Sequence, residues 1–240
     1  MQDLRKAGAE EQISALLARD PAARTPLDDP GAVGFLLQVL PGVKTEQAEE
    51  QIAALLARDP AAHVRLDDPS AVASLVHGMR RSGADDQLAA LLARDPAAHV
   101  SIDHPGGVAA LLHALHEAGA DEQVTALAER VATRTPVDEV SRVGFLLRNV
   151  VKVEAHEQAA MLADRAAAHA PLDDSTAVGH LLSGLQDAGA REQVIVVADR
   201  LPAAGLFGRF LEIGDNAERY RYGLEPDAGA AAPWGWDDLE

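Results

Sequence analysis

The sequence predicts an all-α fold, specifically an α-solenoid of helix–turn–helix repeats about 35 residues long, and two periodic features predict it. A glutamine that follows an acidic residue recurs at spacings of 39, 36, 36, 35 and 35 residues. These glutamines are Gln12, Gln51, Gln87, Gln123, Gln158 and Gln193. A hydrophobic residue followed by an acidic pair keeps the same period at Leu27, Leu66 and Leu172, with degenerate copies at Ile102 and Val137. Units of this length bury their apolar faces by stacking, and we expect a right-handed superhelix.

The first helix of each repeat, which we call helix A, begins at an acidic residue. Asp29 is a good N-cap and Pro30 fits the first helical position. The apolar residues that follow have the i, i+3, i+4, i+7 spacing of a helix buried on one face. Their first members are Val33, Val72, Val108, Val143 and Val178. Three of these helices should end at a left-handed glycine, at Gly83, Gly119 and Gly189.

The second helix, helix B, follows after a few residues. Acidic residues such as Asp121 and Glu122 favour a helix start, and Val124 and Leu127 begin its buried stripe. A basic column lies near its end, at Arg24, His63, His99, Arg134 and His169. In the first three repeats an Asp-Pro pair should break or kink helix B, at Pro21, Pro60 and Pro96.

These patterns divide the chain into seven parts. A partial repeat spans 1–27, and five αα-hairpins follow over 28–66, 67–102, 103–137, 138–172 and 173–200. Residues 201–240 form a C-terminal capping helix, expected from Pro202 to Glu212, and an aromatic tail. The tail residues Tyr220, Tyr222, Trp234 and Trp236 either fold back to cap the last repeat or form an exposed docking motif for a partner.

The N-terminal end should be open. The chain starts with the end of a helix A, and no polar capping repeat covers Ile13, Leu16 and Leu17. Two readings follow: the chain is a fragment of a longer array, or this end docks onto another subunit or domain.

Composition excludes several classes of function. The formal net charge of −17 repels phosphate backbones, and no basic stripe is present, so we expect no nucleic-acid partner even though other helical repeats read one base per repeat. No apolar stretch is long enough to span a bilayer, and no signal-peptide pattern is found. Without cysteine there are no disulfides or thiolate sites. Few lysines among the basic residues indicate a GC-rich genome, and we expect a cytoplasmic bacterial protein.

No motif indicates catalysis or a cofactor. The acidic pairs precede helices, which favours capping over calcium binding. His77, His113 and His116 would be the best metal candidates, but a solvated helix face explains them better. Phosphate loops, zincin motifs and nucleophile elbows are absent. We therefore expect no enzyme, no cofactor and no metal.

The exposed face of helix A is the candidate partner-binding surface. Counting the helix A valine as zero, positions +2, +5, +6 and +9 should lie opposite the buried stripe. Positions +2 and +5 vary freely between repeats, which recognition and neutral drift explain equally well. The candidate residues are Phe35, Gln38, His77, His113, Phe145, Arg148, His180 and Ser183. We expect the partner to be a protein or peptide of basic character.

The period and helix pairing over about 200 residues resemble the tetratricopeptide and related αα-repeat families. The segment from Ala118 to Ala128, with the ending Pro233-Trp234-Gly235-Trp236, looks like uncharacterised actinobacterial repeat arrays. That resemblance implies the sensing or interaction module of a larger bacterial protein and nothing about catalysis. The alternative function is structural: assembly, for example as a homodimer, through the open N-terminal end.

Overall fold

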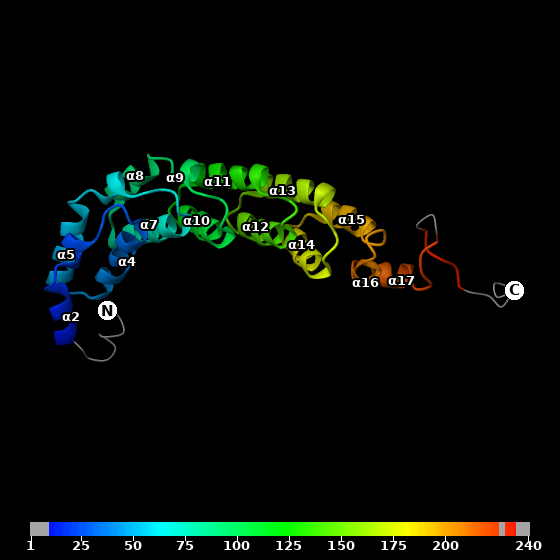
Figure 1. The fold of residues 1–240 in the computed structure, drawn as a ribbon, viewed down its shortest axis with the longest axis horizontal. Helices are drawn as coiled ribbons and strands as arrows, with labels where there is room; N and C mark the ends of the chain where they lie inside the picture. Colours follow the sequence, from blue (N-terminus) through cyan, green and yellow to red (C-terminus); the bar gives the residue numbers. More distant parts are fainter. Residues whose placement is uncertain (1–9, 226–228, 234–240) are drawn as a thin grey trace. The chain divides into compact units, whose positions relative to one another are not determined.

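The protein is all-helical over residues 10–225 and 229–233, which the computed structural model describes (Figure 1). Within these ranges no strand forms, and β pairing is confined to one isolated bridge between Leu224 and Ala230. Packing divides the chain into two units. Unit 1 comprises Met1–Thr135 and Asn149–Ala159, and unit 2 comprises Pro136–Arg148 and Ala160–Glu240.

Unit 1 alternates the two kinds of helix that the sequence predicts. Its helices A are α4 (Pro30–Val39), α7 (Pro69–Ser82) and α10 (Pro105–Glu117), with the 3₁₀-helix η1 (Leu40–Gly42) after α4. Its helices B are α2 (Glu10–Leu17) with α3 (Pro21–Arg24), α5 (Glu46–Leu56) with α6 (Pro60–His63), α8 (Asp85–Leu92) with α9 (Pro96–His99), and α11 (Asp121–Arg134). Helix α7 contacts both α4 and α10, so the three helices A form one layer (Figure 1).

Unit 2 repeats the same alternation. It contains the helix A α14 (Ser175–Asp187) and the helix B α15 (Arg191–Arg200), which pack together. Two short helices follow, α16 (Phe207–Leu211) and α17 (Asn216–Arg219). Helices α12 (Val140–Lys152) and α13 (His156–His169) contribute residues to both units.

The predicted helix caps are present in three repeats. The carboxylate of Asp29 accepts a hydrogen bond from the backbone N–H of Ala32 at 3.0 Å. Asp68 and Asp174 cap α7 and α14 in the same way, each accepting from two backbone N–H groups. Capping is therefore confirmed as the role of these carboxylates.

The predicted break in helix B is also confirmed. Asp20, Asp59 and Asp95 adopt left-handed backbone conformations with φ of 52°, 54° and 54°, and each proline starts a new four-residue helix. Helix α11 lacks the Asp-Pro pair and continues over 14 residues. The glycines that end helices A have the expected positive φ, and they are Gly83, Gly119 and Gly189.

Helices A approach one another so closely that their backbones touch. A Cβ on Gly34 would lie 2.5 Å from the backbone nitrogen of Leu75, and a Cβ on Gly78 would lie 2.5 Å from the Gly34 carbonyl oxygen. In unit 2, a Cβ on Gly184 would lie equally close to the Gly144 carbonyl oxygen. The contact between neighbouring helices A therefore requires residues without a side chain.

This close packing corrects the expectation for position +6. We expected +6 to lie on the exposed face, but four of its five residues are buried: Gly78, Ala114, Asn149 and Gly184. The physical reason is that a helix A packs both on helices B and on other helices A. Its buried arc is therefore wider than the four-residue stripe indicates.

At the N-terminal end the expected exposure fails for Ile13 and Leu17 and holds for Leu16, and at the C-terminal end the expected helix is shorter. Ile13 and Leu17 are only 4% and 3% exposed, because they pack in one cluster with Leu40, Val43 and Ala48. Leu16 alone of the three is open, at 36%. At the other end, the expected Pro202–Glu212 helix is shortened to α16, because the chain turns at Gly205 with a φ of 77°.

We predict that Gly34→Ala lowers the free energy of unfolding by about 1–3 kcal/mol, because the new methyl group meets the backbone of α7. The control is Gly106→Ala, in α10, where a Cβ would have no neighbour within 4 Å. This control should be neutral or stabilising by up to about 1 kcal/mol, because alanine favours a helix. Urea unfolding followed by circular dichroism compares them; equal effects would contradict the close approach.

A second prediction concerns the Asp174 cap. The backbone N–H groups of Ala177 and Thr176 hold the pKa of Asp174 below its ordinary value of 3.8. A lowered folded-state pKa means that the ionised carboxylate stabilises the protein at neutral pH and that this contribution is lost as the pH falls from 3.8 through the lowered pKa.

The comparison uses Asp174→Asn, which keeps a good N-cap but does not titrate. All other carboxylates titrate in both proteins, so the difference between their melting temperatures isolates Asp174. We expect that difference to shift in favour of the Asn variant below pH 3.8. If the difference between the two melting temperatures stayed constant as the pH fell below 3.8, the ionised Asp174 carboxylate would contribute nothing to stability.

Candidate partner-binding surface

On the side of the helix A layer that faces away from helices B, unit 1 exposes one large apolar side chain. Phe35, at position +2 of α4, is 60% exposed. His77, at position +5 of the neighbouring α7, is also exposed, and His113 at +5 of α10 is half-buried. Since α7 contacts both other helices, these three candidates belong to one continuous layer of helices.

A shallow groove of about 330 Å³ lies between α7 and α10 in this layer. Its lining is made of small and polar residues: Ser70, Ala73, Ser74, His77, Ala110, His113, Ala114 and Glu117. The Glu117 carboxylate bonds to the Arg80 guanidinium at 2.8 Å and lies 3.9 Å from Nδ1 of His77. The groove thus has an apolar floor of alanines and a charged edge.

Gln38 serves the packing of the layer. Its side-chain amide donates to the backbone carbonyl of Ser74 at 2.9 Å and to the Ser74 hydroxyl at 3.0 Å. Gln38 therefore joins α4 to α7, although its sequence position placed it among the candidates for partner contact.

The candidates in unit 2 also form contacts between helices A. The Arg148 guanidinium donates to the Ser183 hydroxyl at 3.4 Å, and Nδ1 of His180 lies 3.1 Å from the Ser141 hydroxyl. Phe145 is half-buried. His180 is exposed, as His77 is, whereas Arg148 and Ser183 are half-buried.

The described part of the tail contains the two predicted tyrosines. The Tyr220 ring meets the buried Phe210 of α16 edge-on, with 4.8 Å between centroids. Tyr222 is exposed, with the Arg221 guanidinium over its ring. Helix α16 is held to α14 by a hydrogen bond from Arg209 to Ser175 at 3.1 Å. Trp234 and Trp236 lie outside the described residues.

The periodic glutamines join successive helices B. Gln51 accepts a hydrogen bond from the backbone N–H of Ala22 at 2.9 Å, and Gln87 and Gln123 accept from Ala61 and Ala97 at 3.0 Å. These N–H groups lie in the first turn of the short helices that follow Asp-Pro, where a helix has no internal acceptor. In unit 2, Gln193 donates instead to the Asp164 carboxylate at 2.6 Å.

An arginine seven residues after the glutamine completes each joint, and the sequence analysis missed it. Arg94 donates to the carbonyls of Ala61 and Val64, and Arg130 donates to those of Ala97 and Val100. Arg58 and Arg200 bond to preceding helices B in the same way. We call this arrangement the Gln–Arg pair. The signal was available, since these arginines have the same spacing as the glutamines.

The Arg130 guanidinium is partly removed from water. Burial is the main reason that the pKa of Arg130 is lowered, and the nearby Arg134 adds to the effect while Asp95 opposes it. Burying a charged group costs free energy because its hydration is lost. Here the charge-assisted hydrogen bonds from the guanidinium to backbone carbonyls compensate that cost.

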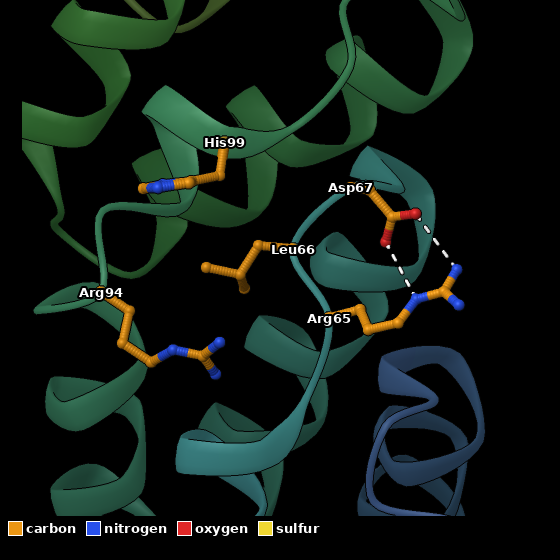
Figure 2. A pocket seen from close by; sticks show the side chains of 5 residues that line it. All are labelled: Arg65, Leu66, Asp67, Arg94 and His99. Atoms are coloured by element: carbon orange, nitrogen blue, oxygen red, sulfur yellow. Dashed lines mark hydrogen bonds and ion pairs between the residues drawn. The ribbon is translucent and has the colours of Figure 1, made fainter.

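A hollow of about 620 Å³ in unit 1 has polar lining groups that are already paired (Figure 2). Its lining residues are Arg65, Leu66, Asp67, Arg94 and His99. Arg94 bonds to the two carbonyls of its Gln–Arg pair, and Nδ1 of His99 contacts the Asp95 carbonyl at 2.8 Å. Arg65 reaches both oxygens of Asp67, at 3.3 and 3.1 Å. The polar groups that line this hollow therefore stabilise the packing of the repeats, and they include no nucleophile–base pair of the kind that catalysis needs.

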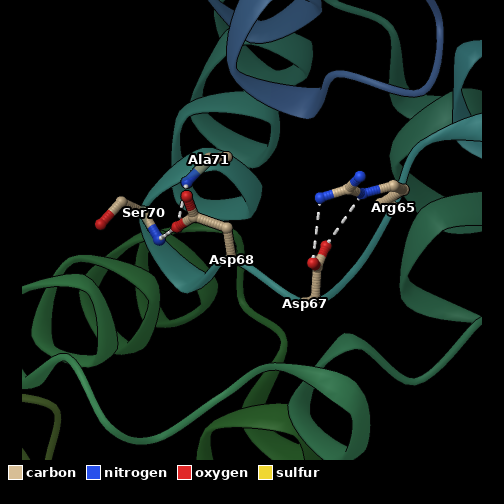
Figure 3. A network of polar contacts seen from close by, with 5 residues as sticks. All are labelled: Arg65, Asp67, Asp68, Ser70 and Ala71. Carbon is tan, nitrogen blue, oxygen red and sulfur yellow. Dashed lines mark hydrogen bonds and ion pairs between the residues drawn. The ribbon is translucent and has the colours of Figure 1, made fainter.

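The acidic pair at Asp67 and Asp68 has two separate uses (Figure 3). Asp68 accepts from the N–H groups of Ser70 and Ala71 at 2.8 and 3.2 Å and caps α7. Asp67 turns the other way, toward Arg65. Its own backbone N–H and the Arg65 guanidinium hold the pKa of Asp67 below its ordinary value. The Asp67 carboxylate therefore stays ionised at neutral pH.

No family model, curated protein or solved structure matches this chain. Among the residues that the structure describes, no group of three or more His, Asp or Glu side chains is placed to hold a metal ion. Over the same described part, none of the helices has the length and apolar character needed to cross a bilayer.

We predict that Arg94→Ala lowers the free energy of unfolding by about 1.5–3 kcal/mol, because charged hydrogen bonds to two carbonyls are lost. Arg19 occupies the same column in the first repeat, but it is exposed, and the described residues supply it with no partner. Arg19→Ala should therefore change stability by less than about 0.5 kcal/mol. Urea unfolding at micromolar protein concentration measures the free energy of unfolding of both variants. If the two variants lost the same stability, the Gln–Arg pair would not stabilise the protein.

Proposed function

We propose that this protein is a non-enzymatic scaffold, an α-solenoid of tetratricopeptide-like αα-hairpins that binds a protein or peptide. Support for the solenoid comes from recurrence: Gln–Arg pairs join successive helices B within each unit, and glycines bring helices A together in both. Stacked hairpins of this kind present an extended surface suited to binding chains. The resemblance to bacterial repeat arrays supports a role as the interaction module of a larger cytoplasmic protein.

The observation that carries the binding proposal is the 60% exposure of Phe35 on the helix A layer of unit 1. Aromatic residues are enriched at protein interfaces relative to the rest of the protein surface. The groove between α7 and α10 lies in the same helix A layer, and its His77 and Glu117 offer polar contacts next to an alanine floor. An apolar side chain of a partner would pack on Phe35 while its backbone or basic groups meet the polar edge.

The charge of the protein indicates the partner's chemistry. With a net charge of −17, the protein attracts a basic segment and repels an acidic one. Association with such a segment would be fast at low salt and would weaken as salt increases, because exposed charges are screened. We therefore propose a basic peptide with one apolar anchor residue as the ligand class.

The experiment is selection of peptides from a random displayed library, followed by affinity measurement on the selected sequences. We predict that Phe35→Ala and His77→Ala each weaken binding about tenfold or more, equivalent to about 1.4 kcal/mol. The matched control is Ile195→Ala, because Ile195 is equally exposed, at 58%, but lies on helix B of unit 2. If no basic peptide is enriched, or if all three variants bind alike, the helix A face is not the binding surface.

A second candidate function is assembly through the N-terminal end. The specific observation in its favour is that Leu16 remains 36% exposed while its neighbours Ile13 and Leu17 are buried.

A further inference from the structure

One face of α2 exposes the residues that the other helices B bury against a preceding helix. Gln12, Leu16 and Arg19 occupy the same three columns as the glutamine, the core leucine and the arginine of each Gln–Arg pair. Leu16 is 36% exposed, whereas all of its counterparts are 0% exposed: Leu55, Leu91, Leu127, Leu162 and Val197. Gln12 and Arg19 are exposed, whereas their counterparts are half-buried.

The counterparts define what this face binds. In three repeats of unit 1 the glutamine side chain accepts a hydrogen bond from a backbone N–H. In unit 2 the Gln193 side chain donates to the carboxylate of Asp164. The arginine donates hydrogen bonds to one or two backbone carbonyls at the end of the preceding helix B, as Arg200 does to Ala167 and Ala170. The matching partner is therefore the carboxyl end of another helix B, with free carbonyls and an aspartate on the preceding turn.

The end of α15 in this chain carries groups of these kinds, and the Pro202 carbonyl, which already accepts from the backbone N–H of Gly205 at 3.0 Å, has a second lone pair for another donor. Asp199 occupies the column of Asp164 and is exposed. Pro202 and Gly205 occupy the columns of Ala167 and Ala170, and they are half-buried and exposed. By contrast, the alanines in the Pro202 column are at most 2% exposed: Ala22, Ala61, Ala97, Ala132 and Ala167.

We propose that the α2 face of one copy binds the α15 end of a second copy, head to tail. Gln12 then donates to Asp199, Arg19 donates to the carbonyls of Pro202 and Gly205, and Leu16 becomes buried at the joint. This inference rests on the repeat packing and specifies the assembly candidate above; it is independent of peptide binding at Phe35.

The two surfaces of this joint are different, so it does not close a symmetric pair. A heterologous contact leaves one α2 face and one α15 end free in every open assembly, so further copies can add until a ring closes. A homodimer through the N-terminal end, the assembly expected from the sequence, would instead use the same surface twice.

The test measures mass by sedimentation equilibrium at about 0.15 M salt, where repulsion between like-charged copies is screened. The wild-type mass should rise from 25.2 kDa past the dimer value as the concentration increases from about 1 µM to about 1 mM. Leu16→Glu and Arg19→Glu should remain monomeric. Arg81→Glu, a matched change at an exposed arginine of α7, should associate like the wild type.

Mixing two variants tests the head-to-tail direction. The Asp199→Lys variant keeps a functional α2 face but has a disrupted binding surface at the end of α15. The Arg19→Glu variant has a disrupted α2 face and keeps the surface at the end of α15. Each should be monomeric alone, and together they should form a 1:1 dimer and nothing larger. Far-ultraviolet circular dichroism confirms that each variant keeps its helices.

Three results would overturn the proposal. These are a wild-type mass that stays at 25.2 kDa at every concentration, association that survives in both α2 variants, and self-association of Asp199→Lys. The last would indicate a symmetric N-terminal contact. Peptide selection is read separately at the Phe35 face, so either proposal can fail while the other stands.

Discussion

The packing of helices B in this protein depends on a polar contact, the Gln–Arg pair, as much as on apolar burial. Breaking helix B at Asp-Pro leaves backbone donors and acceptors near its end without partners in their own helix. Glutamine and arginine from the following repeat supply those partners, as Gln87 and Arg94 do for Ala61 and Val64. A hairpin is thus incomplete in its backbone hydrogen bonding until the next one is in place, which makes neighbouring hairpins cooperative.

The layer of helices A follows a different rule, because contact between its helices depends on the absence of side chains. Gly34 against α7 and Gly144 against α14 let backbones meet, and the remaining gaps are filled by leucine, valine and alanine. This explains how a chain with 3% aromatic residues forms a dense core. Against this background Phe35 stands out, because its ring is 60% exposed.

Features decided within a few residues of chain were predictable from sequence. The Asp29 cap, the break after Asp20 and the left-handed Gly83 depend on local backbone chemistry, and all three are found. Position +6 was misplaced because its burial comes from neighbouring helices A, as for Gly78. Among the candidate site residues, Phe35 and His77 are exposed as expected, whereas Gln38 is engaged by Ser74 about one repeat away, a contact that helical periodicity alone does not contain.

The Gln–Arg pair has a fixed direction, because each repeat carries the side chains and the repeat before it carries the backbone groups. The hairpins 28–66 and 67–102 therefore each carry both halves of the same joint. If residues 67–102 were deleted, Gln123 and Arg130 would meet Ala61 and Val64 in place of Ala97 and Val100, which are chemically the same groups. Gene duplication or loss in whole-repeat steps thus preserves each joint, and the length of such a protein can change in evolution without a redesign of its interior.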